Sequence, residues 1–403
     1  MTADNPALLT VVGVGADGWS GLDGTSHRAL SSAEVILGSP RQLDLLPATI
    51  AARRVPWPTP LLPALPGILA EHKDRRVCVL ASGDPMFHGI GATLARLVGP
   101  HNIYVLPQPS SVSLAAARLG WPLADTDVLS LVNTPVAALH PLVNPGRRIL
   151  ILSAGPDTVT EVAALLTARG FDAGLTLLEQ LGGPGERVLT GTASNWPHAP
   201  SDPLNVVAVE CGAGPRTSVV PGLPDGSYDS DGQLTKREVR AVTLAALAPA
   251  PGELLWDVGA GAGSIAIEWM RAHRACRAIA VEAEAGRAST IVANAEKLGV
   301  PALRIIHGRA PAALADLPRP DAVFIGGGLT GAGVVDACLH ALPAGGRLIA
   351  NAVTLESEAL LYSWYARLGG ELTRVAVQRA GPIGGFTGWR AAMQVTIWSV
   401  VKQ

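Results

Sequence analysis

The stretch LLWDVGAGAGSIAIE, residues 254–268, decides the fold of the C-terminal half of this 403-residue chain. An apolar strand ends at Asp257, a loop with Gly259, Gly261 and Gly263 follows, and an apolar helix begins at residue 264. Glycines let backbone N–H groups come close to a ligand, and such a loop lies at the carboxyl edge of a parallel sheet, where open α/β sheets bind ligands. The stretch therefore predicts a nucleotide-type ligand site, with a purely structural strand-to-helix turn as the alternative.

The spacing of the loop separates two kinds of cofactor. It is GxGxG preceded by an acid, whereas dinucleotide enzymes carry GxGxxG around a pyrophosphate. We therefore expect Asp257 to serve the cationic amino-acid end of S-adenosylmethionine. The next strand ends at Glu282, whose carboxylate would accept hydrogen bonds from the ribose hydroxyls. NAD enzymes also place an acid there, so Glu282 alone does not separate the two cofactors.

The next two strand ends extend the same site. Gly308, Arg309 and Ala310 follow the third strand, where an adenine would be flanked. Gly326 and Gly327 follow the fourth strand and would form the floor of the reaction centre.

The second half alternates strands with helices, which predicts a Rossmann-like α/β sheet. The expected helices are 235–247, 264–272, 284–298, 331–341 and 355–368. The expected strands are 253–258, 278–281, 303–306, 321–325 and 346–350. Two later runs, 371–378 and 390–401, have no helix between them, so we expect a hairpin with one strand antiparallel to the others, seven strands in all.

The first half also predicts an α/β fold, with a largely parallel sheet. Its expected strands are 8–15, 34–37, 76–81, 102–106, 127–132, 147–152, 175–179 and 204–210, with helices at 111–119 and 157–169. The proline-rich stretch 56–66 is expected to be a loop. Residues 212–233 are dense in Gly, Pro, Ser and Asp, which predicts a flexible linker between the halves.

Composition excludes several classes of partner. The formal charge is −2 and aromatic residues are 4%, so the clustered cations and stacking rings of a nucleic-acid interface are missing. No apolar run approaches the roughly 18 residues that a membrane span needs, and no export signal is visible, so we expect a cytoplasmic protein. The four cysteines lie far apart without metal-ligand spacing, so no metal site is predicted.

The second half resembles the decarboxylating precorrin methyltransferase module of cobalamin biosynthesis over residues 234–403. The resemblance rests on the glycine loop together with TKREVR (235–240), HGRAP (307–311), PDAVFIGGG (320–328) and GGRLIANAVTLES (345–357). It implies methylation of carbon 15 of the macrocycle and decarboxylation of the ring C acetate. It also implies a homo-oligomer, such as a tetramer, assembled through this module.

The substrate of that module carries many carboxylates, which suit arginine and lysine partners. The candidates for contacts with the substrate in this half are Lys236, Arg237, Arg240, Asn351, Arg379 and Arg390, together with Gly326 and Gly327. A plain surface charge is the alternative for each cation.

The first half resembles the tetrapyrrole methylase family over residues 8–210. The resemblance rests on VGVG (12–15), ASGDPMF (81–87) and PSSVS (109–113), in this order. It implies two α/β lobes, about 1–107 and 108–211, that hold S-adenosylmethionine between them. The residues it implies are Gly83, Asp84 and Pro85 at the cofactor cleft and Gly13 and Gly15 at the substrate trough.

Two phrases favour the branch of that family that methylates carbon 5 of a precorrin. They are AEVILGSPRQL (33–43) and ASGDPMFHGIG (81–91). Arg41 lies in the first phrase and could meet a substrate carboxylate, with a surface salt bridge as the alternative.

Together the halves predict one enzyme with domains 1–211 and 234–403, two S-adenosylmethionine sites and one precorrin substrate that is methylated twice. No catalytic residue is assigned, because methyl transfer from a sulfonium to an electron-rich carbon depends on orientation more than on acid–base groups. Three alternatives stay open: an RNA or protein methyltransferase fusion, an NAD-linked dehydrogenase, and a chain in which one half only binds intermediates.

Overall fold

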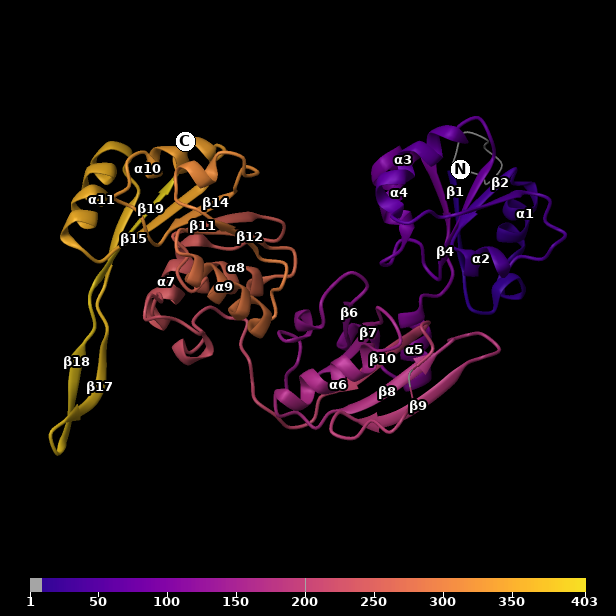
Figure 1. Ribbon diagram of the computed structural model, residues 1–403, viewed down its shortest axis with the longest axis horizontal. Coiled ribbons are helices and arrows are strands. Elements are labelled where there is room, and N and C mark those ends of the chain that lie inside the picture. The colour runs from indigo at the N-terminus through magenta and orange to yellow at the C-terminus, as the bar shows by residue number, and fades with distance from the viewer. Residues whose placement is uncertain (1–8, 200) are drawn as a thin grey trace. The chain divides into compact units, whose positions relative to one another are not determined.

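Three sheets flanked by helices make up most of residues 9–199 and 201–403, which the computed structural model describes (Figure 1). The chain divides into two units. The first contains the described residues up to Val136 together with Asn144–Pro215, and the second contains Ala137–Val143 and Arg216–Gln403. Leu8, where the first strand was expected to begin, lies outside the described residues.

The first lobe of the first unit is a parallel five-stranded sheet in the order β3-β2-β4-β1-β5. Its strands are β1 (Leu9–Val14), β2 (Val35–Gly38), β3 (Arg53–Pro56), β4 (Val77–Ser82) and β5 (Ile103–Leu106). Its helices are α1 (Gly24–Ser32), α2 (Pro40–Asp44), α3 (Leu61–Glu71) and α4 (Ile90–Val98). Val14 at the end of β1 pairs with Ser82 at the end of β4, so the loops that follow these strands are neighbours.

The second lobe has a mixed sheet in the order β6-β7-β10-β8-β9. The strands are β6 (Asp127–Ser130), β7 (Arg148–Leu152), β8 (Gly174–Glu179), β9 (Arg187–Thr192) and β10 (Asn205–Glu210), with helices α5 (Ser111–Leu119) and α6 (Thr158–Ala168). Only β6 and β7 are parallel, whereas β10 is antiparallel to both of its neighbours and β8 is antiparallel to β9. The expected parallel sheet is therefore confirmed for the first lobe and wrong for the second, because a short connection such as that from β8 to β9 returns the chain antiparallel.

The proline-rich stretch 56–66 is not wholly a loop, because α3 begins at Leu61 and contains Pro66. Leu65 is fully buried, and Leu61, Ile68 and Leu69 pack with it against the sheet at helical spacing. Pro66 lies inside the helix and removes one of its hydrogen bonds, so the burial of this apolar face offsets the loss.

The second unit contains a seven-stranded sheet in the order β13-β12-β11-β14-β15-β19-β16. The strands are β11 (Leu254–Val258), β12 (Arg277–Glu282), β13 (Arg304–His307), β14 (Ala322–Ile325), β15 (Arg347–Ala352), β16 (Glu371–Val375) and β19 (Val395–Val401). The helices are α7 (Arg237–Leu247), α8 (Ser264–Ala272), α9 (Ala285–Leu298), α10 (Val334–Ala341) and α11 (Leu355–Leu368). β19 is antiparallel to both β15 and β16, so the prediction of a Rossmann-like seven-stranded sheet with one antiparallel strand is confirmed.

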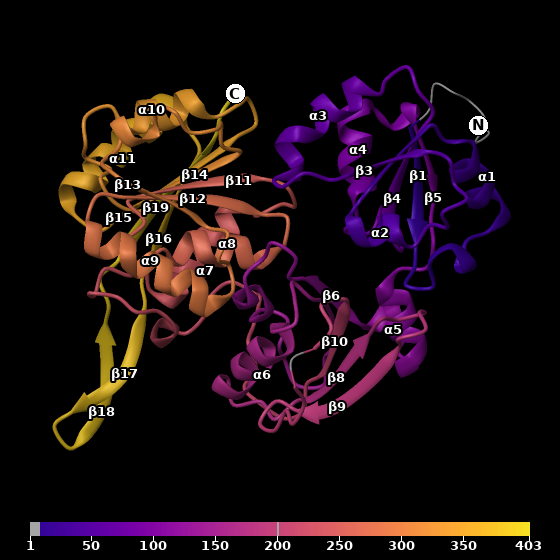
Figure 2. The ribbon, with the colours of Figure 1, turned by 45° about the vertical axis from the view of Figure 1, so that its right-hand side comes forward.

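An additional hairpin, which the sequence pattern did not predict, lies between β16 and β19. It consists of β17 (Gln378–Ile383) and β18 (Phe386–Ala391), which pair only with each other. Two views show it as a ribbon that extends away from the sheet of its own unit (Figures 1 and 2).

The expected linker 212–233 is in large part a component of the second unit. The chain passes to that unit at Arg216, and the side chains of Leu223 and Tyr228 are buried in its core beside Val239. Turn-forming residues dominate the composition of the segment, but two apolar side chains and its backbone contacts fix its path.

Among the described residues, no helix has both the length and the apolar character that crossing a membrane requires.

The place of β19 inside the sheet predicts a stability effect at Trp398. This fully buried side chain donates from Nε1 to the Gly369 carbonyl at 3.0 Å and stacks on Trp364. Replacing Trp398 with Phe leaves a cavity and an unpaired carbonyl, so we expect the free energy of unfolding to fall by about 1–3 kcal/mol in urea titrations. The control change Tyr365→Phe on α11, where the side chain is 41% exposed, should alter it by less than about 0.5 kcal/mol. Equal effects of the two changes would contradict this role of β19.

Candidate active site

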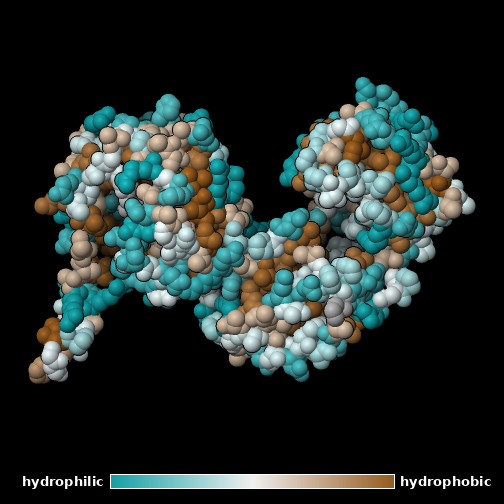
Figure 3. All heavy atoms as spheres, in the orientation of Figure 1, coloured by the Kyte–Doolittle hydropathy of each residue, from teal (hydrophilic) through white to brown (hydrophobic). Residues whose placement is uncertain are grey.

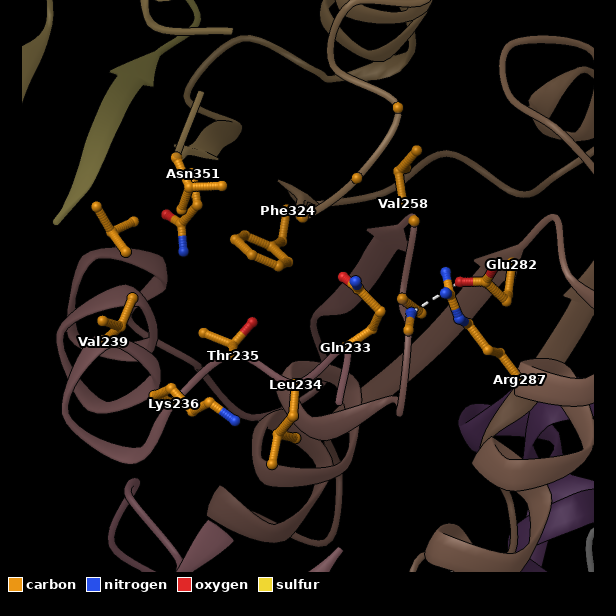
Figure 4. Close-up of a pocket in the computed structure, with 18 of the residues that line it drawn as sticks. Gln233, Leu234, Thr235, Lys236, Val239, Val258, Glu282, Arg287, Phe324 and Asn351 are labelled. Carbon is orange, nitrogen blue, oxygen red and sulfur yellow. Dashed lines mark hydrogen bonds between the residues drawn. The ribbon is translucent and has the colours of Figure 1, made fainter. Parts of the chain in front are cut away.

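The carboxyl edge of the seven-stranded sheet borders a cavity of about 720 Å³. Its walls come from the loops after β11, β12, β13 and β14, from β15, and from the segment that precedes α7 (Figure 4). Most residues predicted for this site line it. They are Lys236, Gly259, Gly261, Glu282, Gly308, Arg309, Ala310, Gly326, Gly327 and Asn351.

Close backbone packing explains the glycines of two of these loops. Gly259 has a φ of 68°, and a Cβ atom there would lie 2.5 Å from the Cα atom of Gly327. The loop after β11 has no room for a side chain at Gly259, so this glycine lets the two backbone segments meet at the cavity floor. Gly263 does not line the cavity. It has a φ of 77° and leads the chain into α8 against Ile291.

Glu282, at the end of β12, is one of the carboxylates that line the cavity, with Glu238 and Glu284. Its Oε2 atom accepts from the Gly261 N–H at 2.8 Å, and its Oε1 atom accepts from the Glu284 N–H at 2.9 Å (Figure 4). These two bonds fix the side chain while each oxygen keeps a further lone pair. The arrangement suits a fixed acceptor for ligand hydroxyls, as the sequence predicts.

Arg287 was missed by the sequence reasoning. It lies one turn into α9, lines the cavity beside Glu282, and donates from Nε to Oδ2 of Asp231 at 2.8 Å (Figure 4). The feature of the sequence that could have indicated Arg287 is its position shortly after the predicted Glu282, in the helix that follows.

Asp257 lies beneath the glycine loop and is not among the described residues that line the cavity. Its side chain is 1% exposed, and Oδ2 accepts from the Ala266 N–H in the first turn of α8 at 3.0 Å. One carboxyl oxygen is therefore bound to the helix, whereas Oδ1 is buried without a hydrogen-bond partner among the described residues, so the expected contact of Asp257 with a cationic ligand stays a prediction. Burial raises the pKa of Asp257 to about 7, and the Glu282 carboxylate adds to this against the Ala266 hydrogen bond.

Asn351 on β15 contributes a polar group on the opposite side from Glu282 (Figure 4). Its Nδ2 atom donates to Oγ1 of Thr243 at 2.9 Å, which leaves Oδ1 oriented as an acceptor. This Oδ1 atom is buried and has no hydrogen-bond partner among the described residues. A buried acceptor without a donor indicates a place where a ligand donor would be stabilised.

The candidate cations differ in position: two line the cavity, two lie outside its lining, and one is buried. Lys236 and Arg379 line the cavity, and Arg379 also forms an ion pair with Glu238. Arg237 and Arg390 are not among the described residues of the lining, so their contact with the substrate stays a prediction. Arg240 is fully buried against Glu268 and is not available to a substrate.

The first unit has a smaller cavity, of about 70 Å³, between its two lobes. Gly15, Arg41 and Gly83 line it from the first lobe, and Leu178 and Asn205 line it from the second. The structure thus brings together three of the residues predicted for this half.

Gly13, Asp84 and Pro85 are not among the described residues that line this smaller cavity. A Cβ atom on Gly13 would lie 2.0 Å from the Gly83 carbonyl oxygen, so Gly13 allows the loops after β1 and β4 to pack. Asp84 accepts from the Met86 N–H at 2.8 Å and shapes the turn. In this structure Gly13 and Asp84 shape the loops beside the cavity, and the predicted roles of Gly13, Asp84 and Pro85 toward cofactor or substrate stay predictions.

Arg41 is held at the edge of the cavity. Its Nη2 atom donates to Oγ of Ser82 at 3.0 Å, and burial lowers the pKa of Arg41 while the Asp202 carboxylate acts in the opposite direction. The side chain therefore presents its charge toward the space between the lobes.

The raised pKa of Asp257 predicts a pH-dependent stability. Between the unfolded value near 3.8 and the folded value of about 7, the folded state binds the extra proton, so stability falls as pH rises through this window. Asp257→Asn should remove this loss and gain on the order of a few kcal/mol near pH 8 relative to pH 4. Urea unfolding at a series of pH values measures it, with the exposed Asp336→Asn as control. A slope that persists in the Asp257 variant would show that another group is responsible.

The chain matches two family models and several full-length relatives. The models are Tetrapyrrole (Corrin/Porphyrin) Methylases over residues 8–197 and Precorrin methyltransferase domain over residues 226–402. A precorrin-6Y C(5,15)-methyltransferase (decarboxylating) of Sinorhizobium sp is 48% identical over 98% of this chain and 96% of its own length. A protein of the same name from Mycobacterium tuberculosis is 49% identical over 98% of this chain and 100% of its own.

A solved structure, the C-terminal domain of precorrin-6Y C5,15-methyltransferase from Rhodobacter capsulatus, is 48% identical and covers 46% of this chain and 100% of its own, with a TM-score of 0.44. The full-length relatives do not favour an RNA or protein methyltransferase or a dehydrogenase. The chain is a methyltransferase and belongs to the precorrin-6Y C(5,15)-methyltransferase (decarboxylating) family, with a tetrapyrrole methylase domain followed by a precorrin methyltransferase domain.

Proposed function

We propose that this chain methylates one precorrin at carbons 5 and 15 and removes the ring C acetate carboxyl group as carbon dioxide, in cobalamin biosynthesis. The first unit would act at carbon 5, and the second at carbon 15 and in the decarboxylation. The observation that carries the proposal is the cavity at the edge of the second sheet, with Glu282 and the glycine loop on one side and Asn351 on the other.

This cavity fits S-adenosylmethionine. Its volume of about 720 Å³ lies in the range of small-molecule sites. Glu282 would accept the ribose hydroxyls, Gly308, Arg309 and Ala310 would flank the adenine, and Oδ1 of Asn351 offers an acceptor for the ammonium group. When bound, the cofactor supplies an electrophilic methyl group, and the electron-rich macrocycle supplies the attacking carbon.

The residues of the second unit would then act by orientation. Gly326, Gly327, Phe324 and Val239 line the cavity; the two glycines would leave space for a flat macrocycle, and the two apolar side chains would exclude water from the transfer path. Lys236 and Arg379 lie where substrate carboxylates could pair with them. Holding the reacting carbon in line with the methyl group is the main requirement of such a displacement.

In the first unit, binding of the cofactor requires a change of conformation. A cavity of about 70 Å³ is too small for a second S-adenosylmethionine, so the two lobes must part or their side chains must rotate. We propose that Gly83 and Gly15 border that second cofactor site, with Arg41 facing a substrate carboxylate. The domain limits predicted from the sequence, 1–211 and 234–403, are also part of this proposal.

Two measurements on the full-length chain test the function. Calorimetry should find two S-adenosylmethionine sites per chain, and mass spectrometry of the tetrapyrrole product should find two added methyl groups and one lost carbon dioxide. Glu282→Ala removes the ribose acceptor, so we expect one binding site and no decarboxylation. The exposed Glu296→Ala on α9 is the control and should leave both unchanged. A single site in the unaltered chain would rule out the two-cofactor scheme.

We also propose that the chain assembles with copies of itself through the β17–β18 hairpin. Phe386 is 84% exposed and Trp389 71% exposed, and Ile383 is exposed beside them, so the hairpin carries exposed apolar and aromatic side chains; its end is partly brown in Figure 3. An isolated two-stranded ribbon is only marginally stable in water, and exposed aromatic side chains on it favour burial against a partner.

Replacing both Phe386 and Trp389 with Ser should therefore shift the protein to a smaller species. Sedimentation velocity at several concentrations measures this, with the exposed pair Leu355 and Tyr362 on α11 changed to Ser as the control. A monomeric unaltered chain would refute the assembly, and an unchanged size of the hairpin variant would exclude this surface.

A further inference from the structure

The segment from residue 218 to residue 235 is attached along its length to the second unit. The Ser218 carbonyl accepts from Arg271 at 3.0 Å. Asn294 accepts from the Asp229 N–H at 2.9 Å and donates back to the Asp229 carbonyl at 2.9 Å. The segment therefore has a defined path over α8 and α9.

One carboxylate lies at the centre of these contacts. Glu268, the last residue of the stretch that decides the fold, is on α8 and is 2% exposed. Its Oε2 atom accepts from the Gly222 N–H at 2.6 Å. Its Oε1 atom accepts from the Leu223 N–H at 3.0 Å and from the Tyr228 hydroxyl at 2.8 Å. Three of its hydrogen bonds thus come from the segment.

The fourth partner of Glu268 connects this cluster to the cavity. Arg240 on α7 donates from Nε to Oε1 of Glu268 at 2.6 Å. Its Nη1 atom donates to the Thr235 carbonyl at 2.5 Å, and its Nη2 atom donates to the Leu223 carbonyl. The guanidinium carbon also lies 4.7 Å from the centre of the Tyr228 ring. Arg240 therefore holds both ends of the stretch from Leu223 to Thr235.

The end of this stretch forms a wall of the cofactor cavity. Gly232, Gln233, Leu234, Thr235 and Lys236 all line the cavity (Figure 4). The Gln233 carbonyl oxygen approaches Gly261 so closely that a Cβ atom there would lie 3.0 Å from it. The backbone of this wall and the glycine loop thus pack closely against each other at the edge of the cavity.

We propose that Glu268 and Arg240 are positioning residues for the cofactor of the second unit, which keep the wall 232–236 in place against the glycine loop. The proposal rests on the proposed function, because it assigns S-adenosylmethionine to this cavity. Neither side chain touches the cavity, so both act through the backbone of the segment.

The physical basis is the cost of an unpaired buried charge. Removing the charge of Glu268 takes away the buried carboxylate at 2.6 Å and leaves the Arg240 guanidinium with Asp225 alone, a partly exposed partner at 3.4 Å. The segment can relieve that cost by moving away so that water reaches Arg240, and the movement would take Thr235 and Gln233 with it. Cofactor affinity should fall although every cavity residue is unchanged.

The experiment compares three variants of the full-length chain by calorimetry with S-adenosylmethionine. Glu268→Gln keeps the shape and removes the charge, and Tyr228→Phe removes one hydrogen bond while it keeps the ring under Arg240. Glu253→Gln is the matched control, since it breaks the Glu253–Arg347 ion pair at the opposite, amino end of the sheet, where Oε1 accepts at 3.0 Å. We expect the Kd of the site that Glu282→Ala abolishes to rise about tenfold or more in Glu268→Gln, less in Tyr228→Phe, and not in Glu253→Gln.

Limited proteolysis provides a readout that does not depend on the cofactor. Trypsin should cleave after the exposed Lys236 or Arg237 faster in Glu268→Gln than in the unaltered chain or in Glu253→Gln. If Glu268→Gln does not fold, Tyr228→Phe carries both measurements.

The outcomes distinguish the positioning role of Glu268 and Arg240 from the proposed function on which that role rests. Unchanged affinity and unchanged cleavage in Glu268→Gln and Tyr228→Phe, with the second site intact in the unaltered chain, would overturn the positioning role alone. Equal loss of affinity in Glu253→Gln would also overturn it, because general destabilisation would then suffice. An unaltered chain without a second site would overturn the proposed function and this inference together.

Discussion

The contact between the backbones of Gly259 and Gly327 is the constraint on which the second unit's site depends. The loops after β11 and β14 meet where a Cβ atom on Gly259 would lie 2.5 Å from Gly327. Because β11 and β14 are parallel neighbours, both loops leave the sheet at the same edge. Their close approach forms a floor without side chains, and Glu282 and Asn351 rise on either side of it. A broad, flat ligand needs such a floor, and a loop with side chains would fill the space.

Buried charge is arranged differently at the two acids near this floor. Glu282 accepts two backbone N–H groups at the cavity wall, whereas Asp257 has one such donor and a second oxygen without a partner among the described residues. The difference follows from position, since Asp257 is inside the strand and Glu282 ends one. Glu282 is therefore suited to a ligand, while Asp257 supports the start of α8.

The sequence can predict which residues line the cavity where those residues lie at the ends of strands. Gly259, Glu282 and Gly308 follow successive strands of a parallel sheet, and the sheet brings them to one edge whatever the details of packing. Asp257 could not be assigned in this way, because the direction of its side chain depends on the N–H groups of α8. Arg240 could not be assigned either, because its partner Glu268 is far away in sequence and its burial is visible only in the folded chain.

The fold, like the site, was predictable from the sequence in some parts and not in others. The alternation of strands and helices predicts both α/β units, and one antiparallel strand in the second is confirmed. Composition predicted a loop where α3 forms and a flexible linker where the segment after Arg216 is packed. In both places a few buried side chains outweigh many prolines and glycines. The parallel character of the second lobe's sheet was wrong because the direction of a strand depends on its connection, and periodicity carries no information about that.

The position of β19 bears on how the second unit folds during synthesis. β19 follows all other strands of its sheet in sequence, yet it pairs with β15 on one side and β16 on the other. Until residue 401 has left the ribosome, β15 has an open edge and β16 has no neighbour in the sheet, so the growing chain exposes the apolar faces that Trp398 and Ile397 later cover. The first unit has no such dependence on the C-terminal strand, since its described strands are complete by Glu210. We therefore expect the two units to acquire their structure at different times, with the sheet of the second completed only after β19 has been synthesised.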